Sequence, residues 1–192
     1  MRPKHGWLTA VVTLTLGGGV LVASLGGCAG CEPTNQYYEP TQPIPFSHAL
    51  HAGATKIQCQ YCHYGAEQSR HAGIPAPSVC MNCHTEVRTD SPEVAKIRQA
   101  VETNKPIEWV RVHRVPDHVY FSHEPHVTAA VPCERCHGPV AEMTVVSQWA
   151  SLTMGFCLDC HRTAPAEFLG DTTSTPLQMR GGALTDCAVC HH

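Results

Sequence analysis

The stretch FSHEPHVTAAVPCERCHGPV, residues 121–140, joins two histidine motifs, FSHxxH and CxxCH. In CERCH, Cys133 and Cys136 are separated by two residues and His137 follows at once. This is the attachment motif of c-type haem, in which two thiols form thioethers with the porphyrin vinyl groups and the adjacent histidine binds the iron. Two intervening residues place both sulfurs along one porphyrin edge. The stretch therefore predicts a covalently bound haem with further histidines close by in the chain.

Four more copies of the motif lie on either side: CQYCH from Cys59, CMNCH from Cys80, CLDCH from Cys157 and CAVCH from Cys187. Five covalently bound haem c groups are therefore expected. The thioether residues are Cys59, Cys62, Cys80, Cys83, Cys133, Cys136, Cys157, Cys160, Cys187 and Cys190. The proximal iron ligands are His63, His84, His137, His161 and His191.

Two other interpretations of these cysteines fit less well. The 17 residues between Cys62 and Cys80 match the spacing of a four-cysteine zinc ribbon. A chain outside the cytoplasm with 12 Cys is also compatible with a disulfide framework. Neither explains why a histidine follows five of the six CxxC pairs. The sixth pair, Cys28 and Cys31, is followed by Glu32 and is not a haem site.

The composition agrees with a chain that needs cofactors to fill its interior. Among 192 residues there are 4 Phe, 3 Trp and 5 Tyr, against 15 Gly and 15 Pro. So few large apolar side chains rarely make a sufficient core without metals, disulfides or covalent groups. The net charge of −3 argues against a general nucleic-acid binder, which carries a basic excess.

The N-terminus predicts a tether to the cytoplasmic membrane, with the rest of the chain on the periplasmic or outer side. Residues 7–25 are uncharged and follow two basic residues, so a helix there would nearly span the hydrocarbon layer with its basic end in the cytoplasm. Alternatively, the lipobox-like sequence before Cys28 indicates a lipoprotein signal with lipidation of Cys28. Residues 1–27 are thus an N-terminal anchor or a lipoprotein signal.

Residues 28–47 are interpreted as a proline-rich, extended linker, and residues 48–192 as the pentahaem domain. An internal repeat organises this domain, because FSHALH at Phe46 recurs as FSHEPH at Phe121. Each copy precedes two CxxCH motifs. The domain therefore divides into two dihaem repeats, about 48–84 and 123–161, and a C-terminal haem at 187–191.

Enough histidines remain to give every iron a second imidazole ligand. The distal candidates are His48, His51, His113, His118, His123 and His126. His71 and His192 rank below them, and Met143 and Met154 are the thioether candidates for one site or simply pack on a porphyrin. An iron with two strong protein ligands has no open position for substrate. Electron passage is therefore expected, with no catalytic residues.

The expected fold is a multihaem cytochrome c of mostly irregular coil with short α-helices and at most a small β-hairpin, wrapped around five haems. Ser91 and Pro92 predict the start of a helix that ends near Thr103. A second short helix is expected over residues 139–146. Alternating runs at 109–113 and 118–121, around a Pro-Asp turn, predict the hairpin.

From Pro43 to about Ala164 the chain resembles the pentahaem cytochrome c component of bacterial alternative complex III, a quinol-oxidising complex. The residues that carry the resemblance are QPIPFSHALHAG (42–53), CQYCH (59–63), HAGIPAPSVCMNCH (71–84), SPEVAKI (91–97), PIEWVRVHRVPDHVYFSH (106–123), CERCHGPVAEM (133–143) and MGFCLDCHR (154–162). In small bis-histidine cytochromes of similar pattern the first histidine of FSHxxH ligates the next haem, and the second reaches a neighbouring one. The short C-terminus and the lipobox depart from the family pattern, and they bear on the mode of anchoring rather than on the haem core.

The resemblance implies an electron-transfer subunit of a respiratory chain complex that has no catalytic site of its own. Its implied partners are an iron–sulfur, molybdopterin-like subunit, integral membrane quinol-binding subunits and a monohaem cytochrome c or another periplasmic acceptor. An alternative is a membrane-anchored multihaem quinol dehydrogenase of the small tetrahaem type, which oxidises quinol itself. We rank it second because the linker separates the anchor from the first haem and FSHxxH is duplicated.

Overall fold

A computed structural model describes residues 14–16, 19–21, 34–163 and 185–192. The chain divides into two units, Met1–Pro33 and Thr34–His192. In the first unit, β1 (Leu14–Leu16) pairs antiparallel with β2 (Gly19–Leu21), and Leu14 faces Leu21 in the ladder. The remainder of the anchor predicted over residues 7–25 lies outside the described residues, as does Cys28. Within the described parts, no helix has both the length and the apolar character needed to cross a bilayer.

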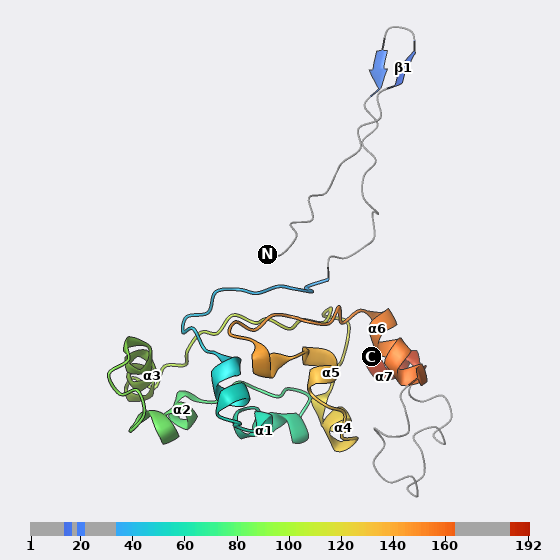
Figure 1. Ribbon diagram of the computed structural model, residues 1–192. Coiled ribbons are helices and arrows are strands. Elements are labelled where there is room, and N and C mark those ends of the chain that lie inside the picture. Colours follow the sequence, from blue (N-terminus) through green and yellow to red (C-terminus); the bar gives the residue numbers. More distant parts are fainter. Residues whose placement is uncertain (1–13, 17–18, 22–33, 164–184) are drawn as a thin grey trace, which may run out of the picture. The chain divides into compact units, whose positions relative to one another are not determined.

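The second unit consists of short helical segments joined by extended chain, as the composition predicts (Figure 1). In chain order the segments are η1 (Ala49–Ala54), α1 (Cys59–Cys62), η2 (Tyr64–Glu67), α2 (Pro77–His84), α3 (Pro92–Glu102), α4 (His123–Thr128), α5 (Glu134–His137), η3 (Val140–Glu142), α6 (Met154–Thr163) and α7 (Cys187–Cys190).

The protein part of the core is thin. In the described chain the buried apolar side chains are Ile44, Ala66, Val94, Ile97, Val112 and Ala150. Among the described residues, the only large side chain that is fully buried is a polar one, that of Gln148. Six small or medium apolar residues bury too little surface to stabilise a domain of this length alone, because each contributes only about 1–3 kcal/mol. The fold therefore requires additional buried contacts, and covalent porphyrins are of the size needed.

The helix predicted after Ser91 is confirmed as α3. Pro92 occupies its first position, where a missing N–H costs nothing, and Val94 and Ile97 bury one face at i, i+3 spacing. The helix packs on α2. The prediction of a helix over 139–146 is wrong in extent, because only the single turn η3 forms there. Met143 already has an extended backbone, and its carbonyl accepts from the Ala49 N–H at 2.8 Å.

The predicted hairpin at 109–121 is also wrong. The turn exists, with the Val119 N–H donating to the Pro116 carbonyl at 2.9 Å, but the two runs form no ladder. A side-chain amide occupies the backbone groups of the first run instead: Gln42 bonds both the N–H and the carbonyl of Val110, each at 2.9 Å. In the second run, the Tyr120 N–H donates to the carbonyl of Cys190 at 2.8 Å.

The described part of the predicted linker, residues 34–47, is irregular chain with a turn at Gln36 and Tyr37, and it packs against the rest of its unit. The Tyr37 N–H donates to the Gln148 carbonyl at 2.7 Å, and the Gln148 N–H donates to the Tyr38 carbonyl at 3.1 Å. Ile44 is 6% exposed. These residues therefore supply a core contact and long-range hydrogen bonds to their unit.

Candidate functional site

All five CxxCH motifs fold into a helical turn, which places the two cysteines at i and i+3 on one face. We number the motifs in chain order as site 1 (Cys59–His63), site 2 (Cys80–His84), site 3 (Cys133–His137), site 4 (Cys157–His161) and site 5 (Cys187–His191). At sites 1, 3 and 5 the histidine N–H donates to the carbonyl of the first cysteine, at 2.8 to 3.0 Å. Local helix geometry therefore puts the two cysteines of each site on one face, with the histidine directly after them in the chain.

None of the ten motif cysteines is disulfide-bonded, so the disulfide interpretation does not describe them. Within residues 34–163 and 185–192, no group of three or more Cys, His, Asp or Glu side chains converges as a metal-ion cluster. Burial raises the pKa of the Cys62, Cys80, Cys136 and Cys157 thiols. The two cysteines of each motif are thus neither joined in a disulfide nor part of a metal-ion cluster, and they remain as a pair for attachment to one porphyrin edge.

Each of sites 2 to 5 lies beside a second histidine from elsewhere in the chain. His51 faces His84 with ring centres 6.2 Å apart, and His123 faces His137 at the same distance. The corresponding distance is 5.9 Å for His126 and His161 and 5.5 Å for His118 and His191. Because a histidine nitrogen binds a metal at about 2 Å, two imidazoles on opposite sides of one metal have ring centres about 6 Å apart. The spacing therefore fits an iron between each pair.

His48 lies near the histidine of site 1. Burial, followed by the nearby His63, lowers the pKa of His48 to about 4. Its Nδ1 is buried and has no hydrogen-bond partner in the described chain. A neutral imidazole with a buried, unpaired nitrogen costs stability unless a ligand completes it. The side chain is thus suited to bind an iron held by site 1.

The two copies of FSHxxH have the same geometry. Phe46 lies edge-on to His48, at 4.9 Å and 84°, and Phe121 lies edge-on to His123, at 4.8 Å and 84°. In each copy the same phenylalanine also contacts the second histidine, His51 or His126. The aromatic ring therefore fixes both imidazoles. The first histidine of each copy lies by the first motif of its repeat, and the second lies by the second motif.

Backbone carbonyls orient most of these imidazoles, a set of partners that the sequence does not reveal. The distal His51, His123 and His126 donate through Nδ1–H to the carbonyls of Ser47, Arg70 and Ser122 at 2.8 to 2.9 Å. The proximal His63, His84 and His191 donate to the carbonyls of Gly73, Val87 and His118 at 2.7 to 3.0 Å. A proton on Nδ1 leaves the Nε2 lone pair for a metal, an arrangement common among metal-binding histidines.

The other candidates lie differently. His113 contacts the ring of His137 at 4.4 Å between centres, and burial lowers the pKa of His113. Burial, followed by His113 itself, lowers the pKa of His137 to about 3. His192 stacks on Tyr120 at 4.2 Å, His71 is exposed, and the Met154 side chain is 66% exposed. Met143 lies after η3, where its backbone holds η1.

Neighbouring thiols give the order of the sites in space. Cys80 is among the groups that raise the pKa of Cys62, which brings site 2 beside site 1. Burial raises the pKa of Cys133 and the nearby Cys59 adds to the shift, which brings site 1 beside site 3. Burial also raises the pKa of Cys136, and Cys160 and Cys157 add to that shift, which brings site 4 beside site 3.

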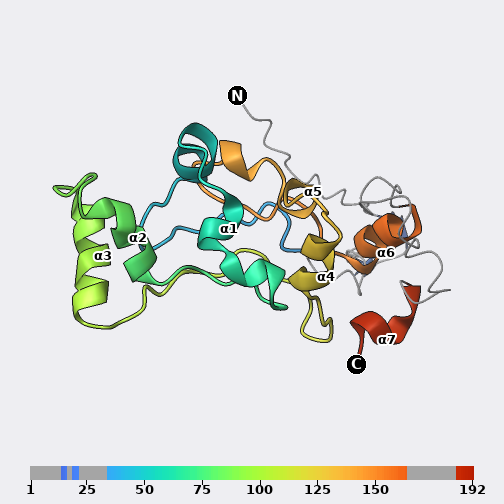
Figure 2. The ribbon, with the colours of Figure 1, turned by 90° about the horizontal axis from the view of Figure 1, so that it is seen from below.

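Site 5 follows site 4, because Cys190 raises the pKa of Cys157. The sites therefore follow the order 2–1–3–4–5. Figure 2 shows the helices that carry them in this sequence, from α2 through α1, α5 and α6 to α7.

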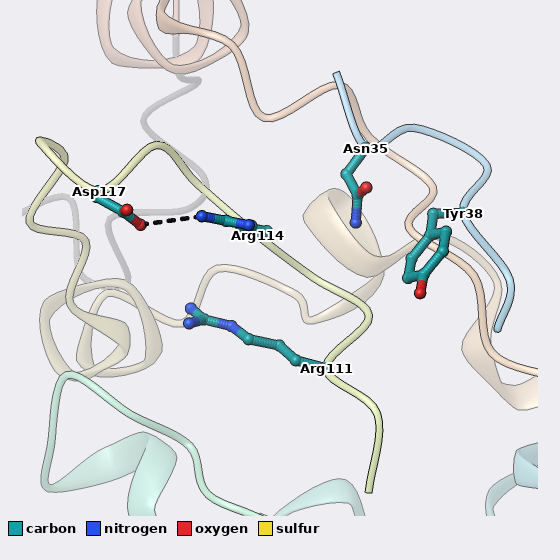
Figure 3. Close-up of a pocket in the computed structure, with 5 residues that line it drawn as sticks. All are labelled: Asn35, Tyr38, Arg111, Arg114 and Asp117. Atoms are coloured by element: carbon teal, nitrogen blue, oxygen red, sulfur yellow. Dashed lines mark hydrogen bonds and ion pairs between the residues drawn. The ribbon is translucent and has the colours of Figure 1, made fainter. Parts of the chain in front are cut away.

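A polar surface hollow lies beside the extended run that carries His113. It is lined by Asn35, Tyr38, Arg111, Arg114 and Asp117 (Figure 3). Arg114 pairs with Asp117 at 3.4 Å, and both side chains are mostly exposed, so this ion pair contributes little stability. The Arg111 Nε–H donates to the carbonyl of His113 at 3.1 Å. Two of the lining side chains, Arg111 and Asn35, thus bond backbone carbonyls at and next to His113.

Comparison with known proteins agrees with the chemistry of the motifs. Residues 119–192 match the family model described as cytochrome c7 and related cytochrome c. Over 106 residues the chain is 34% identical to the multihaem cytochrome c subunit of menaquinone reductase from Nitratidesulfovibrio vulgaris, strain Hildenborough. The match covers 55% of this chain and 50% of the relative, so the chain spans about half the length of that protein. The matched parts of the chain are thus similar to multihaem cytochromes c, a class of protein in which haem c is the covalent cofactor.

Proposed function

We propose that the chain is a pentahaem electron-transfer subunit of a membrane-bound, quinone-linked oxidoreductase of the alternative complex III kind. The observation that carries the proposal is that sites 2 to 5 each have their own second histidine at a ring-centre distance of 5.5 to 6.2 Å, from His51, His123, His126 and His118, while the buried His48 lies near site 1. Two imidazoles per iron leave no position for a substrate, so the sites favour electron passage over catalysis.

When bound, haem c supplies a one-electron redox centre at each site. The protein residues bind and orient the group. The paired thiols would anchor the porphyrin, and the backbone carbonyls that accept from Nδ1–H hold imidazoles such as those of His51, His63 and His84 in one orientation and tautomer. The spatial order 2–1–3–4–5 gives the chain two ends, site 2 beside α3 and site 5 at α7. Electrons therefore enter at one end and leave at the other.

The name of the relative supports a quinone-linked complex, because that protein is a subunit of a menaquinone reductase. The proposed partners are an iron–sulfur, molybdopterin-like subunit, integral membrane quinol-binding subunits and a monohaem cytochrome c. The proposed location is the outer side of the cytoplasmic membrane, since basic residues precede the apolar N-terminal stretch. Electrons would pass from the iron–sulfur subunit through this chain to the monohaem cytochrome or a periplasmic acceptor.

A pyridine haemochrome assay combined with intact mass tests the proposal on the purified chain. The expected result is five haems per chain, with carbon monoxide failing to bind the reduced protein because every iron has two histidines. A count below five, or a carbon monoxide adduct at one haem, would contradict it. Oxidation of a menaquinol analogue by the isolated chain would favour the tetrahaem-type quinol dehydrogenase instead.

A further inference from the structure

His113 lies in a stretch of chain whose backbone is fixed on both sides by side-chain amides. The Asn35 Nδ2–H donates to the carbonyl of Val112 at 2.8 Å, and the Arg114 N–H donates to Oε1 of the buried Gln148 at 3.0 Å. Val112 itself is 7% exposed. An imidazole mounted on such a backbone has little freedom to move, which is what a positioning group needs.

The ring of His113 meets the proximal histidine of site 3. Nδ1 of His137 and Nε2 of His113 are 3.2 Å apart, with an angle of 69° between the rings. The proximal histidines of sites 1, 2 and 5 use backbone carbonyls at the same position. Site 3 thus has a side-chain partner where these three sites have a peptide oxygen.

We propose that His113 is a positioning residue for site 3, whose Nε2 accepts the Nδ1–H of His137, and is not itself an iron ligand. This rests on the proposed function, because the argument requires His137 to bind iron through Nε2. A histidine bound through Nε2 carries its proton on Nδ1, so the 3.2 Å contact has one donor and one acceptor. Nε2 of His113 is then engaged, and His123 remains as the distal ligand, 6.2 Å from His137 between ring centres.

The contact has a consequence for the redox properties of site 3. A hydrogen-bond acceptor at Nδ1–H makes an iron-bound imidazole more electron-rich, which favours the oxidised iron and lowers the reduction potential. An imidazole nitrogen is a stronger base than a peptide oxygen. His113 therefore lowers the potential of the third haem, which stands in the middle of the spatial order.

The experiment compares spectroelectrochemical titrations of the intact chain and two variants, His113→Leu and His113→Gln. Loss of the acceptor in His113→Leu is expected to change the redox equilibrium of one haem about tenfold, about 59 mV upward for a one-electron couple. The amide oxygen of His113→Gln restores a weaker acceptor and should give a smaller upward shift. The matched control is His71→Leu, an exposed histidine, which should titrate like the unmodified protein.

The spectroscopic readout separates positioning from ligation. All haems of His113→Leu are expected to stay low-spin in electron paramagnetic resonance, with one set of g-values changed and no carbon monoxide adduct. A high-spin haem that binds carbon monoxide would identify His113 as a ligand and overturn the inference. Reduction potentials of His113→Leu equal to those of the unmodified protein would also overturn the inference. If His113→Leu does not incorporate its haems, unchanged potentials in His113→Gln would overturn it instead. Fewer than five haems in the unmodified protein would instead refute the proposed function.

Discussion

Replacing His126 by alanine tests the most specific feature of the site geometry, the assignment of a distal histidine to a distant motif. In sequence, His126 lies nearest to the CxxCH of site 3, which begins at Cys133. In the structure its ring lies 5.9 Å from His161 of site 4, and its Nδ1–H donates to the Ser122 carbonyl at 2.8 Å. We therefore expect His126→Ala to open the iron of site 4 and to leave site 3 intact.

The expected size of the effect follows from the spacing. Metal–nitrogen bonds of about 2 Å put two trans imidazole rings about 6 Å apart, which the 5.9 Å separation matches. Alanine removes the whole imidazole, so one iron per chain loses one of its two histidine ligands. That haem should become high-spin and bind one carbon monoxide per chain, while the other haems remain closed.

The assay is carbon monoxide titration of the reduced protein, in two backgrounds that each lack one haem. With Cys157 and Cys160 replaced by alanine, site 4 carries no haem, and adding His126→Ala should create no new carbon monoxide site. With Cys133 and Cys136 replaced instead, adding His126→Ala should still create one. The opposite pattern would show that His126 serves site 3 and would refute the pairing derived from the ring distances.

Two further predictions concern the frame that holds the sites. Gln148→Met leaves the Arg114 N–H and the Ala150 carbonyl without their partners and should cost about 2–4 kcal/mol of unfolding free energy in denaturant titration. The matched Gln36→Met loses only an exposed bond and should stay within about 0.5 kcal/mol; equal costs would contradict the reasoning. Gly138→Ala, at φ +70° and ψ −164° with its new Cβ against Trp149, should cost at least about 2 kcal/mol by the same measurement. Gly73→Ala, at φ +76° in open space, should cost only about 1–2 kcal/mol, and a larger loss there than at position 138 would contradict the steric argument.

Several features followed from local sequence because their causes are local. A CxxC spacing puts two thiols on one face of any helical turn, so the thiol pairs and proximal histidines required no tertiary information. The start of α3 followed from Pro92 at the first helical position. The hairpin at 109–121 failed because alternation predicts a strand but not its partner, and the Gln42 side chain took the bonds of Val110.

The CxxCH sites and the surplus of histidines can be read directly from the chain, since attachment chemistry depends on adjacent residues. Which histidine faces which site follows only from how the chain folds. His118 and His191 are 73 positions apart, yet their ring centres lie 5.5 Å apart, because the backbone of residues 118–120 lies against α7. The partnership of His113 with His137 likewise depends on Asn35 and Gln148, distant residues that fix its backbone. Ligand pairing is a long-range property, and packing sets it.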